Sequence, residues 1–327
     1  LRAKREKTCC SLSDVEDARS VARRLGMPYQ VFNFKGDFKE KVIDKFIATY
    51  EAGGTPNPCI DCNRYLKFDH LLNRARELGC DYIATGHYVQ RWQDENGRWG
   101  LRKNDDPGKD QSYVLYSLTQ DQLAHTLFPL GGMHKDAVRA IAEEQGLCNA
   151  RKHDSQDICF VPDGDYVGFM ERYTGKYYPD GDFIDTTGKV VGRHHGAVRY
   201  TNGQRKGLGL ALGAPVYVCG KDMEKNLLIV QQGEHEELFS LGLEANKVSF
   251  IEGEPPAREF ECTAKFRYRQ SDQKVKVTMH GDGCTVDFAE PQRAVTPGQW
   301  VVFYDGEECL GGGPIDATRP MKEIKIG

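Results

Sequence analysis

The sequence lacks the features of a membrane-bound or secreted protein. No apolar run approaches the ~20 residues of a membrane-spanning helix, and no signal-peptide pattern accompanies the charged segment at residues 2–7. The 11 cysteines are an odd number and cannot all pair with one another. Without a secretory segment, we expect mostly reduced thiols in a cytoplasmic protein that has no membrane partner.

The chain also lacks an overall basic charge. Its 44 lysines and arginines are outnumbered by 48 aspartates and glutamates, which gives a formal net charge of −4. A nucleic-acid partner would therefore have to bind local basic patches. There are no internal repeats or low-complexity segments, and 327 residues predict two or three domains.

The first half of the chain alternates between helical and extended patterns. The expected elements are helices at 13–25, 38–50, 71–78 and 135–145, strands at 29–34 and 81–84, and a hairpin of 89–92 with 99–103. This alternation predicts a parallel α/β sheet. Ligands bind beyond the carboxyl ends of the strands in such sheets, where Thr85-Gly86-His87-Tyr88 follows the second strand.

The second half has a different texture. Glycine-rich sequence with short strands at 216–218 and 227–230 surrounds a flexible basic loop, Gly203–Gly209, whose glycines would let backbone approach phosphate. Beyond Gly233, strands at 260–268, 274–280, 284–288 and 299–304 predict a small barrel or sandwich. On the first of these, the cluster Lys265, Arg267, Tyr268 and Arg269 suits phosphate contact and base stacking, or forms a solvated strand face.

The stretch Gly54–Phe68 sets two prolines beside a Cys-x-x-Cys pair, Cys59 and Cys62. Proline fixes its own φ and extends the preceding residue, so residues 55–58 should form a stiff, non-helical loop that holds a sulfur in place. A structural turn with two buried cysteines is the alternative. Taken alone, Cys159 fits a core cysteine, and the polar segment Lys109–Tyr113 fits a solvated loop.

Together, these segments resemble the tRNA-uridine 2-sulfurtransferases, the tRNA 2-thiouridylase family. The resemblance covers essentially the whole chain. It rests on the order of Cys9-Cys10-Ser11-Leu12, Thr55-Pro56-Asn57-Pro58, Cys62-Asn63, Leu66-Lys67-Phe68, Thr85-Gly86-His87-Tyr88, Lys109-Asp110-Gln111-Ser112-Tyr113, Asp154-Ser155-Gln156-Asp157-Ile158-Cys159, Gly203-Gln204-Arg205-Lys206-Gly207-Leu208 and Phe266-Arg267-Tyr268-Arg269-Gln270.

The resemblance implies an α/β fold with three domains. Residues 1–160 would form an adenine nucleotide α-hydrolase-like (PP-loop ATPase) parallel-sheet domain. Residues 161–233 would form a small central tRNA-binding domain, and residues 240–327 a C-terminal β-barrel.

The implied function is ATP-dependent 2-thiolation of the wobble uridine of tRNA. Uridine O2 would be adenylated, and sulfur would then come from a cysteine persulfide, giving 2-thiouridine, AMP and pyrophosphate. Cys62 matches the nucleophile, Cys159 matches the persulfide carrier that forms a transient disulfide with Cys62, and Gly86 matches an ATP contact. The positions that match base or tRNA contacts are Asn57, Pro58, Cys59, His87, Lys109, Asp110, Gln111, Arg267, Tyr268 and Gln299.

The implied cofactors and partners follow from this reaction. ATP would be a co-substrate, accompanied by Mg, and the anticodon arm of tRNA would be the acceptor. A cysteine desulfurase or a sulfur-relay protein would donate the sulfur.

The sequence departs from the family pattern at two places. Members normally open with a strand and a Ser-Gly-Gly-x-Asp-Ser loop that holds the ATP pyrophosphate, and this chain has no such loop. We therefore expect a truncated chain whose ATP binding is impaired. Many members also carry an aspartate where Cys59 stands, so proton transfer by that aspartate does not carry over.

Three alternative hypotheses remain at this point. Cys59, Cys62 and Cys159 could ligate a [4Fe–4S] cluster that supports thiolation. The chain could instead be a non-catalytic tRNA-binding fragment. An ATP-dependent ligase that shares the adenylating fold would need no paired cysteines. Structural zinc is disfavoured because no second Cys-x-x-Cys supplies the remaining ligands.

Overall fold

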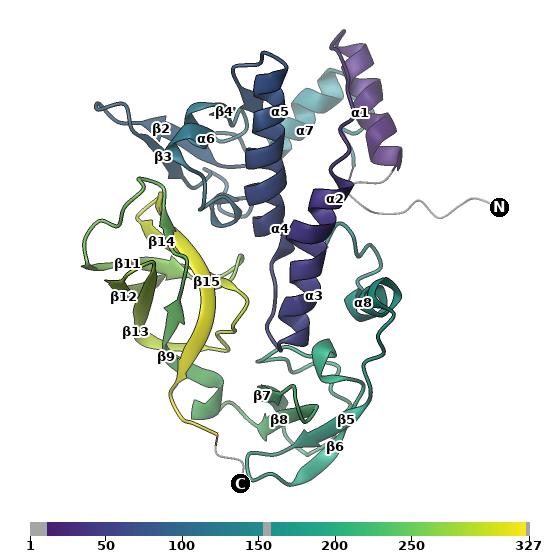
Figure 1. Cartoon of the computed structure of the whole chain (residues 1–327), viewed down its shortest axis with the longest axis vertical. Helices are drawn as coiled ribbons and strands as arrows, with labels where there is room; N and C mark the ends of the chain where they lie inside the picture. Colours follow the sequence, from purple (N-terminus) through teal and green to yellow (C-terminus); the bar gives the residue numbers. More distant parts are fainter. Residues whose placement is uncertain (1–11, 153–157, 325–327) are drawn as a thin grey trace, which may run out of the picture.

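The structure is a computed structural model that describes residues 12–152 and 158–324. Two long helical segments stand side by side in the first part of the chain (Figure 1). The first runs through α2 (Lys35–Phe38), η1 (Lys39–Ile43) and α3 (Asp44–Glu51). The second runs through α4 (Pro58–Asp61), η2 (Cys62–His70) and α5 (Leu71–Glu77). Both are continuous, because the residues at each junction keep right-handed helical backbone angles.

The second segment begins earlier than the sequence predicts. Asn57 caps it by accepting a hydrogen bond from the Cys59 backbone N–H at 3.2 Å. Pro58 occupies the first helical position, where its missing N–H costs nothing and its fixed φ suits the helix. Residues 55–57 are therefore a non-helical loop as expected, but the expected loop position of the two thiols is wrong. Cys59 and Cys62 lie in the first turns of a helix.

The remaining elements of the first part form a small parallel pairing and a hairpin. β1 (Ile83–Ala84) pairs in parallel with β4 (Thr126–Leu127), and β2 (Gln90–Gln93) pairs with β3 (Trp99–Arg102) as expected. The helical elements here are α1 (Leu12–Arg24), η3 (Ser112–Val114), α6 (Gln120–Ala124) and α7 (Lys135–Glu144). The strand expected at 29–34 is absent, because no strand within residues 12–152 and 158–324 pairs with it.

The central part contains α8 (Tyr166–Thr174), η4 (Ala197–Arg199) and a four-stranded sheet in the order β6-β5-β8-β7. These strands are β5 (Gly181–Ile184), β6 (Val190–His194), β7 (Val216–Asp222) and β8 (Leu227–Gln232). β7 and β8 confirm and extend the strands predicted at 216–218 and 227–230. Tyr166 of α8 stacks on Tyr50 of α3 with ring centroids 4.4 Å apart, which attaches α8 to the first part.

The last part is a closed barrel. It follows η5 (Glu236–Leu238) and consists of β9 (Phe239–Ala245), β10 (Ser249–Phe250), β11 (Glu259–Lys265), β12 (Gln273–His280), β13 (Gly283–Arg293), β14 (Trp300–Asp305) and β15 (Glu308–Pro320). The order β14-β11-β12-β13-β9-β15 closes because β14 also pairs with β15. Closure removes the exposed sheet edges that would otherwise invite aggregation.

The strand predicted at 260–268 ends early, at Lys265. The Gln270 side chain accepts from the Phe266 N–H at 2.9 Å, and the Gln270 N–H donates to the Arg267 carbonyl at 3.1 Å. These bonds close a turn, so the predicted strand position of Arg267, Tyr268 and Arg269 is wrong. The turn leaves all three side chains exposed.

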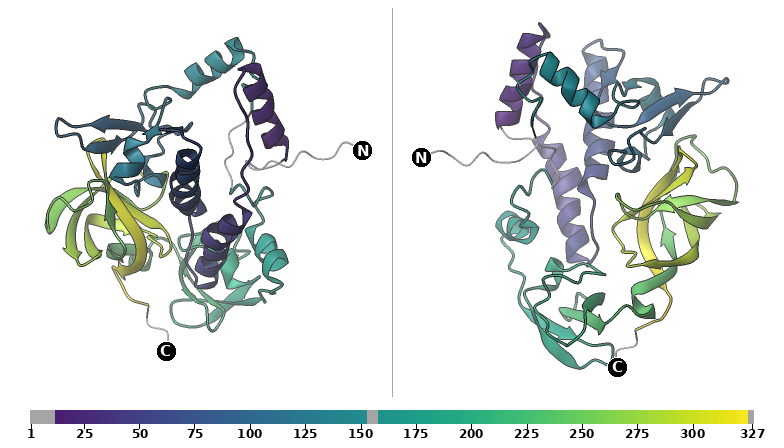
Figure 2. Two further views of the ribbon diagram at one scale, coloured as in Figure 1. Left: turned by 45° about the horizontal axis from the view of Figure 1, so that its top comes forward. Right: turned by 180° about the vertical axis from the view of Figure 1, so that it is seen from behind.

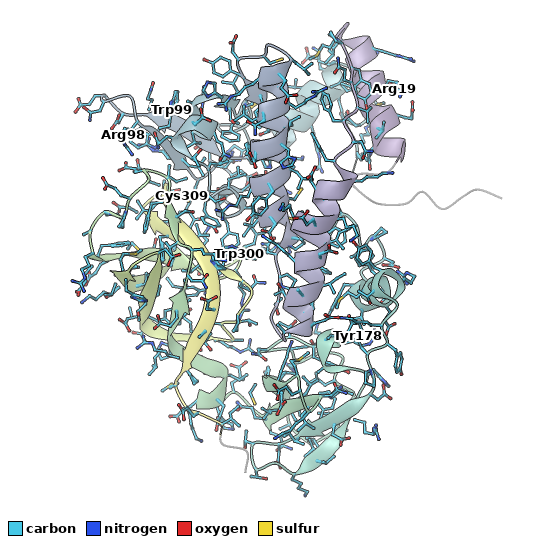
Figure 3. The ribbon with its side chains drawn as sticks, in the orientation of Figure 1. Arg19, Arg98, Trp99, Tyr178, Trp300 and Cys309 are labelled. Carbon is cyan, nitrogen blue, oxygen red and sulfur yellow. The ribbon has the colours of Figure 1, made fainter. Side chains whose placement is uncertain are left out.

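The barrel and the first part share one hydrophobic core. β3 extends the barrel sheet by pairing Leu101 with Cys309 of β15, and the buried Tyr113 packs in the same cluster as Val302 and Tyr304. Trp99, Cys309 and Trp300 are labelled along this seam in Figure 3. The barrel and α8 lie on opposite sides of the helix pair in all three views (Figures 1 and 2). None of the described helices has the length and apolar character to cross a membrane.

Gly54 provides a test of how tightly the first part is held to the barrel. A Cβ there would lie 2.9 Å from the Pro297 carbonyl oxygen and 2.9 Å from Thr49 Cγ2. We expect Gly54→Ala to destabilise the protein by about 1–3 kcal/mol, because the barrel loop must move away. In Gly36→Ala, the matched control, the new Cβ meets nothing within 4 Å. Thermal unfolding measures both, and equal melting temperatures would contradict the contact.

Candidate functional site

Cys59 lies within electrostatic range of residues that come from distant parts of the chain. Its side chain is exposed, but the surrounding protein raises the pKa of the thiol, while the nearby Lys67 ammonium opposes that rise. Tyr268 of the barrel interacts electrostatically with both Cys59 and Asp110. The structure therefore brings Cys59, Lys67, Asp110 and Tyr268 together, and the Cys59 thiol is protonated at neutral pH.

His87 lies beside Lys67 just beyond β1. It is 8% exposed and packs against the rings of Phe68 and Phe128, at 5.6 and 6.4 Å between centroids. Burial, followed by the nearby Lys67 charge, lowers the pKa of His87 to about 3. The ammonium of Lys67 can only donate, so His87 Nε2 accepts from it at 3.4 Å, and Nδ1–H donates to Thr85 Oγ1 at 2.8 Å. The site thus holds a neutral imidazole in a fixed tautomer.

Gln111 fixes the backbone next to this histidine. Its N–H donates to the Tyr88 carbonyl and its side-chain oxygen accepts from the Tyr88 N–H, both at 2.9 Å. Lys109 and Gln111 are half-buried, whereas Asp110, Ser112 and Tyr113 are buried. The segment Lys109–Tyr113 is therefore not a solvated loop.

The Asp110 carboxylate is fully engaged inside the protein. Oδ1 accepts from the Asn104 and Ser112 N–H groups at 3.2 and 3.1 Å. Oδ2 accepts from Ser112 Oγ at 2.8 Å and lies 3.8 Å from Lys265 Nζ of the barrel. Because both of its oxygens are bonded within the protein, Asp110 fixes the backbone at Asn104 and Ser112 and faces the Lys265 ammonium.

Lys265 belongs to a largely buried charge network at the seam between the first part and the barrel. Its Nζ lies 3.6 Å from Asp272, and Asp272 in turn lies 2.6 Å from Lys103. Both lysines stand over the ring of Tyr304, whose hydroxyl lies 3.1 Å from Ser112 Oγ. Buried charges are stable only when they are paired and hydrogen-bonded in this way, so the network requires the barrel to be docked.

The turn with Arg267 and Tyr268 rests on this seam. The Tyr268 ring lies 6.0 Å from the buried ring of Tyr113, whose hydroxyl donates to the Trp300 carbonyl at 3.0 Å. Burial raises the pKa of Tyr268 to about 12, although 37% of its surface stays exposed. Arg267 donates to the backbone carbonyls of Arg293 and Ala294.

Gln299 ties the barrel to the loop that precedes Cys59. Its Nε2 donates to the Thr55 carbonyl at 2.6 Å, and the Thr55 N–H donates to the Pro297 carbonyl at 3.0 Å. Asn57 is half-buried and Pro58 is buried at the start of α4. These contacts fix the entry to the helix that carries both cysteines.

Cys62 and Cys159 are both half-buried. Cys62 follows Cys59 by three residues on one helix face, and the adjacent Asn63 donates to the Val114 carbonyl at 3.2 Å. Beside Cys159, Phe160 packs on Phe46 and Phe38 with centroids 5.1 and 5.6 Å apart. The predicted motif residues Cys9, Cys10, Ser11 and 154–157 lie outside the described residues.

Gly86 is exposed just beyond the carboxyl end of β1. A Cβ there would meet only a Leu130 methyl group, at 3.7 Å. A ligand can therefore approach this backbone closely, which is the property that an ATP contact needs.

The described residues do not form a metal site. No three His, Cys, Asp or Glu side chains within residues 12–152 and 158–324 are arranged to hold a metal ion. Cys59, Cys62 and Cys159 all belong to this part of the chain, so the three-thiolate arrangement for an iron–sulfur cluster is not formed. We derive no step through such a cluster.

Sequence reasoning missed the parts of the site that support the predicted contacts. Lys67 and Tyr113 lie within the segments that carry the resemblance, and Lys265 lies within the basic-aromatic cluster. The motifs therefore contained all three residues without indicating what they do. The roles of Tyr113 and Lys265 depend on pairing between segments more than 100 residues apart, and the role of Lys67 depends on its contact with His87. No local pattern signals these contacts.

Comparisons with known proteins agree with this architecture. Residues 1–163 match the tRNA methyl transferase HUP domain, residues 167–232 its PRC-barrel domain, and residues 240–315 the aminomethyltransferase β-barrel domain. A HUP domain followed by two barrel modules defines a class of tRNA-modifying enzyme, and the predicted fold class is confirmed.

Similar proteins identify the family within that class. The tRNA-specific 2-thiouridylase MnmA of Clostridium acetobutylicum is 50% identical over 95% of this chain and 87% of its own length. The protein of that name from Geotalea uraniireducens is 50% identical over 94% and 82%, and that from Enterococcus faecalis is 47% identical over 97% and 86%. The chain belongs to the tRNA-specific 2-thiouridylase family.

The buried histidine predicts a pH dependence of stability. Between the ordinary imidazole pKa near ~6.5 and the folded value of about 3, only the unfolded chain binds the proton. The stabilisation is complete above pH ~6.5 and is lost as the pH falls, by about 2 kcal/mol at pH 5. Urea unfolding at pH 7 and pH 5 should show this loss. His87→Gln should not show the part of this loss that comes from protonation of His87. If the free energy of unfolding depended on pH equally in both proteins, His87 would not be its source.

Proposed function

We propose that this chain catalyses ATP-dependent 2-thiolation of the wobble uridine in tRNA. The observation that carries the proposal is the convergence of Cys59, His87, Asp110 and Tyr268 beside the helix turn that bears Cys62. Side chains from the first part of the chain and from the barrel both contribute to this site near the Cys59 thiol. Sulfur transfer to an RNA base would use cysteines at such a place, whereas an ATP-dependent ligase would need no paired thiols.

The chemistry needs two thiols with different tasks. Transfer of AMP to uridine O2 would turn a poor leaving group into a good one. Cys159 would carry the persulfide, and the Cys62 thiolate would attack its inner sulfur. This attack forms a Cys62–Cys159 disulfide and releases sulfide, which attacks C2 of the base and displaces AMP. A thiol reductant must then restore both cysteines.

We divide the predicted tRNA-binding residues into those that would touch the RNA and those that would shape the site. Cys59, Lys109 and Tyr268 would contact the target base or nearby nucleotides, with the exposed Tyr268 ring as a stacking surface. The other predicted positions would shape the site through the bonds described above. These are Asn57, Pro58, His87, Asp110, Gln111, Arg267 and Gln299.

Cys59 would not replace an aspartate as a proton acceptor. Its raised pKa keeps the thiol protonated at neutral pH, so it can offer only a weak hydrogen-bond donor to the base. Proton transfer during adenylation would then fall to solvent or to the nucleotide phosphates. The exposed Gly86 backbone would contact ATP.

The remaining partners follow from the reaction. Mg would accompany ATP, and a cysteine desulfurase or sulfur-relay protein would load Cys159 with sulfur. The anticodon arm of tRNA would be the acceptor, and the reaction would take place in the cytoplasm.

Replacing the two proposed catalytic cysteines provides the direct test. We expect Cys62→Ser and Cys159→Ser each to abolish 2-thiouridine formation, at least ~10³-fold, while tRNA affinity stays within about twofold. Cys80→Ser, at an exposed cysteine, is the matched control and should keep full activity. The assay combines tRNA, ATP and a persulfide donor, with nucleoside analysis as the readout.

The outcomes separate the competing functions. Activity that survives in Cys62→Ser would favour a ligase-type reaction without paired thiols. Tight tRNA binding by the unmodified chain with no thiolation would favour the non-catalytic fragment. Iron and charge-transfer absorbance after anaerobic reconstitution, lost in Cys59→Ser, would favour the cluster hypothesis.

Asp110 supplies a second prediction about the same site. Asp110→Asn removes the charge that faces Lys265 and weakens its charge-assisted hydrogen bonds. We therefore expect kcat/KM for tRNA to fall about 10–100-fold. Asp105→Asn, at an exposed carboxylate in the same segment, is the control and should stay within about twofold. Equal kinetics in the two variants would remove Asp110 from the site.

A further inference from the structure

The segment Gly203–Gly209 presents two adjacent cations that the protein does not neutralise. Arg205 and Lys206 are both exposed, and neither forms an ion pair with a carboxylate of the described residues. Many other exposed cations of the central part have such a partner, for example Arg193 with Asp182 and Lys225 with Asp222. A pair of free cations on one short loop is a local basic patch on an otherwise acidic chain.

Several hydrogen bonds hold the loop, although its glycines had suggested a flexible one. Gln204 closes it from within: its side-chain oxygen accepts from the Thr201 N–H, and its Nε2 donates to the Lys206 carbonyl, both at 3.0 Å. The Gly203 and Val218 N–H groups bond it to β7 at 2.7 and 3.0 Å. Leu208 is buried in the central core and anchors the far end.

Arg293 of the barrel holds the same loop from the other side. Its Nη2 donates to the Gly203 carbonyl at 3.3 Å, and its guanidinium stands 5.0 Å over the Tyr217 ring of β7. Gly203 lies so close to Ala294 that a Cβ there would come within 2.4 Å of the Ala294 Cβ. The loop is therefore attached to the barrel as well as to β7.

The same barrel turn also leads to the candidate active site. Arg267 donates to the carbonyls of Arg293 and Ala294, and its neighbour Tyr268 interacts electrostatically with Cys59. A continuous series of contacts thus runs from Arg205 and Lys206 through Gly203, Arg293 and Arg267 to the proposed target-base site. The separation between the two places is set by the fold.

We infer that the Gly203–Gly209 loop binds the phosphodiester backbone of the tRNA substrate and fixes its register relative to the target base. This inference rests on the proposed function. Arginine and lysine are the usual phosphate-binding side chains, and the glycines at 207 and 209 leave the backbone open to a phosphate. We favour an RNA over an acidic protein as the ligand. Only a ligand that reaches from the loop to Tyr268 would need the loop and the target-base site at a fixed separation.

The test compares two double variants that remove equal charge. Arg205→Gln/Lys206→Gln removes the unpaired cations, and Arg193→Gln/Lys225→Gln removes two cations that already have carboxylate partners. We expect the first variant to bind tRNA on the order of tenfold more weakly near 0.1 M salt. We also expect its slope of log affinity against log salt to be shallower by about 1.5. The control variant should bind like the unmodified chain.

A third variant separates position from charge. Gln204→Ala keeps both cations but removes the bonds that fix the loop. Its affinity should fall several-fold while the salt slope stays unchanged, because the phosphate contacts remain possible in a less ordered loop.

Each outcome decides the inference. Equal tRNA affinity and equal salt slopes in the two double variants would overturn the inference. It would also be overturned if Arg205→Gln/Lys206→Gln bound tRNA normally but lost only sulfur transfer from a donor protein. That result would assign the loop to the donor protein instead. An unmodified chain that binds no tRNA would overturn the proposed function and the inference together. Normal binding and thiolation by the unmodified chain and by Arg205→Gln/Lys206→Gln would overturn the inference alone.

Discussion

The short backbone segment at Gly53–Thr55 is the point on which the rest of the structure depends. Met223 of the central part lies against Gly53, where a Cβ would come within 2.8 Å of its Cγ. On the other side, Pro297 and Gln299 of the barrel bond to the N–H and carbonyl of Thr55. All three parts of the chain therefore meet within three residues of backbone, directly before the helix that carries Cys59 and Cys62. The thiols hold their position because this junction is closed.

Charged side chains at the seam between the first part and the barrel help to determine how these two parts dock. Without the barrel, Lys103 and Asp110 of the first part would lose their ion-pair partners Asp272 and Lys265, and burying such charges unpaired costs several kcal/mol. Apolar contacts such as Trp300 against the shared core give most of the affinity between the parts. The ion pairs then favour the observed docking of the two parts, in which Tyr268 interacts electrostatically with Cys59.

The sequence was sufficient for the elements whose signal is local. The strand predicted at 274–280 is β12, the hairpin predicted for 89–92 with 99–103 is β2–β3, and the family segments indicated the residues around Cys59. The sequence was insufficient where contacts that the local pattern does not show determine the structure. Asn57 and Pro58 start a helix where two prolines suggested a loop, and Gln270 ends β11 before Tyr268. Asp110 looked like a surface contact, because Lys265 lies more than 100 residues away.

The electrostatic character of the site agrees with an uncharged base as the proposed substrate. Burial keeps His87 neutral, desolvation keeps the Cys59 thiol protonated, and the Asp110 carboxylate is already bonded within the protein. A neutral base can enter such surroundings without displacing a strongly hydrated ion. Lys67 places a positive charge among these neutral groups, held in direction by His87. Negative charge that develops on a base oxygen during activation would meet this ammonium, so His87 contributes to the proposed chemistry by staying uncharged.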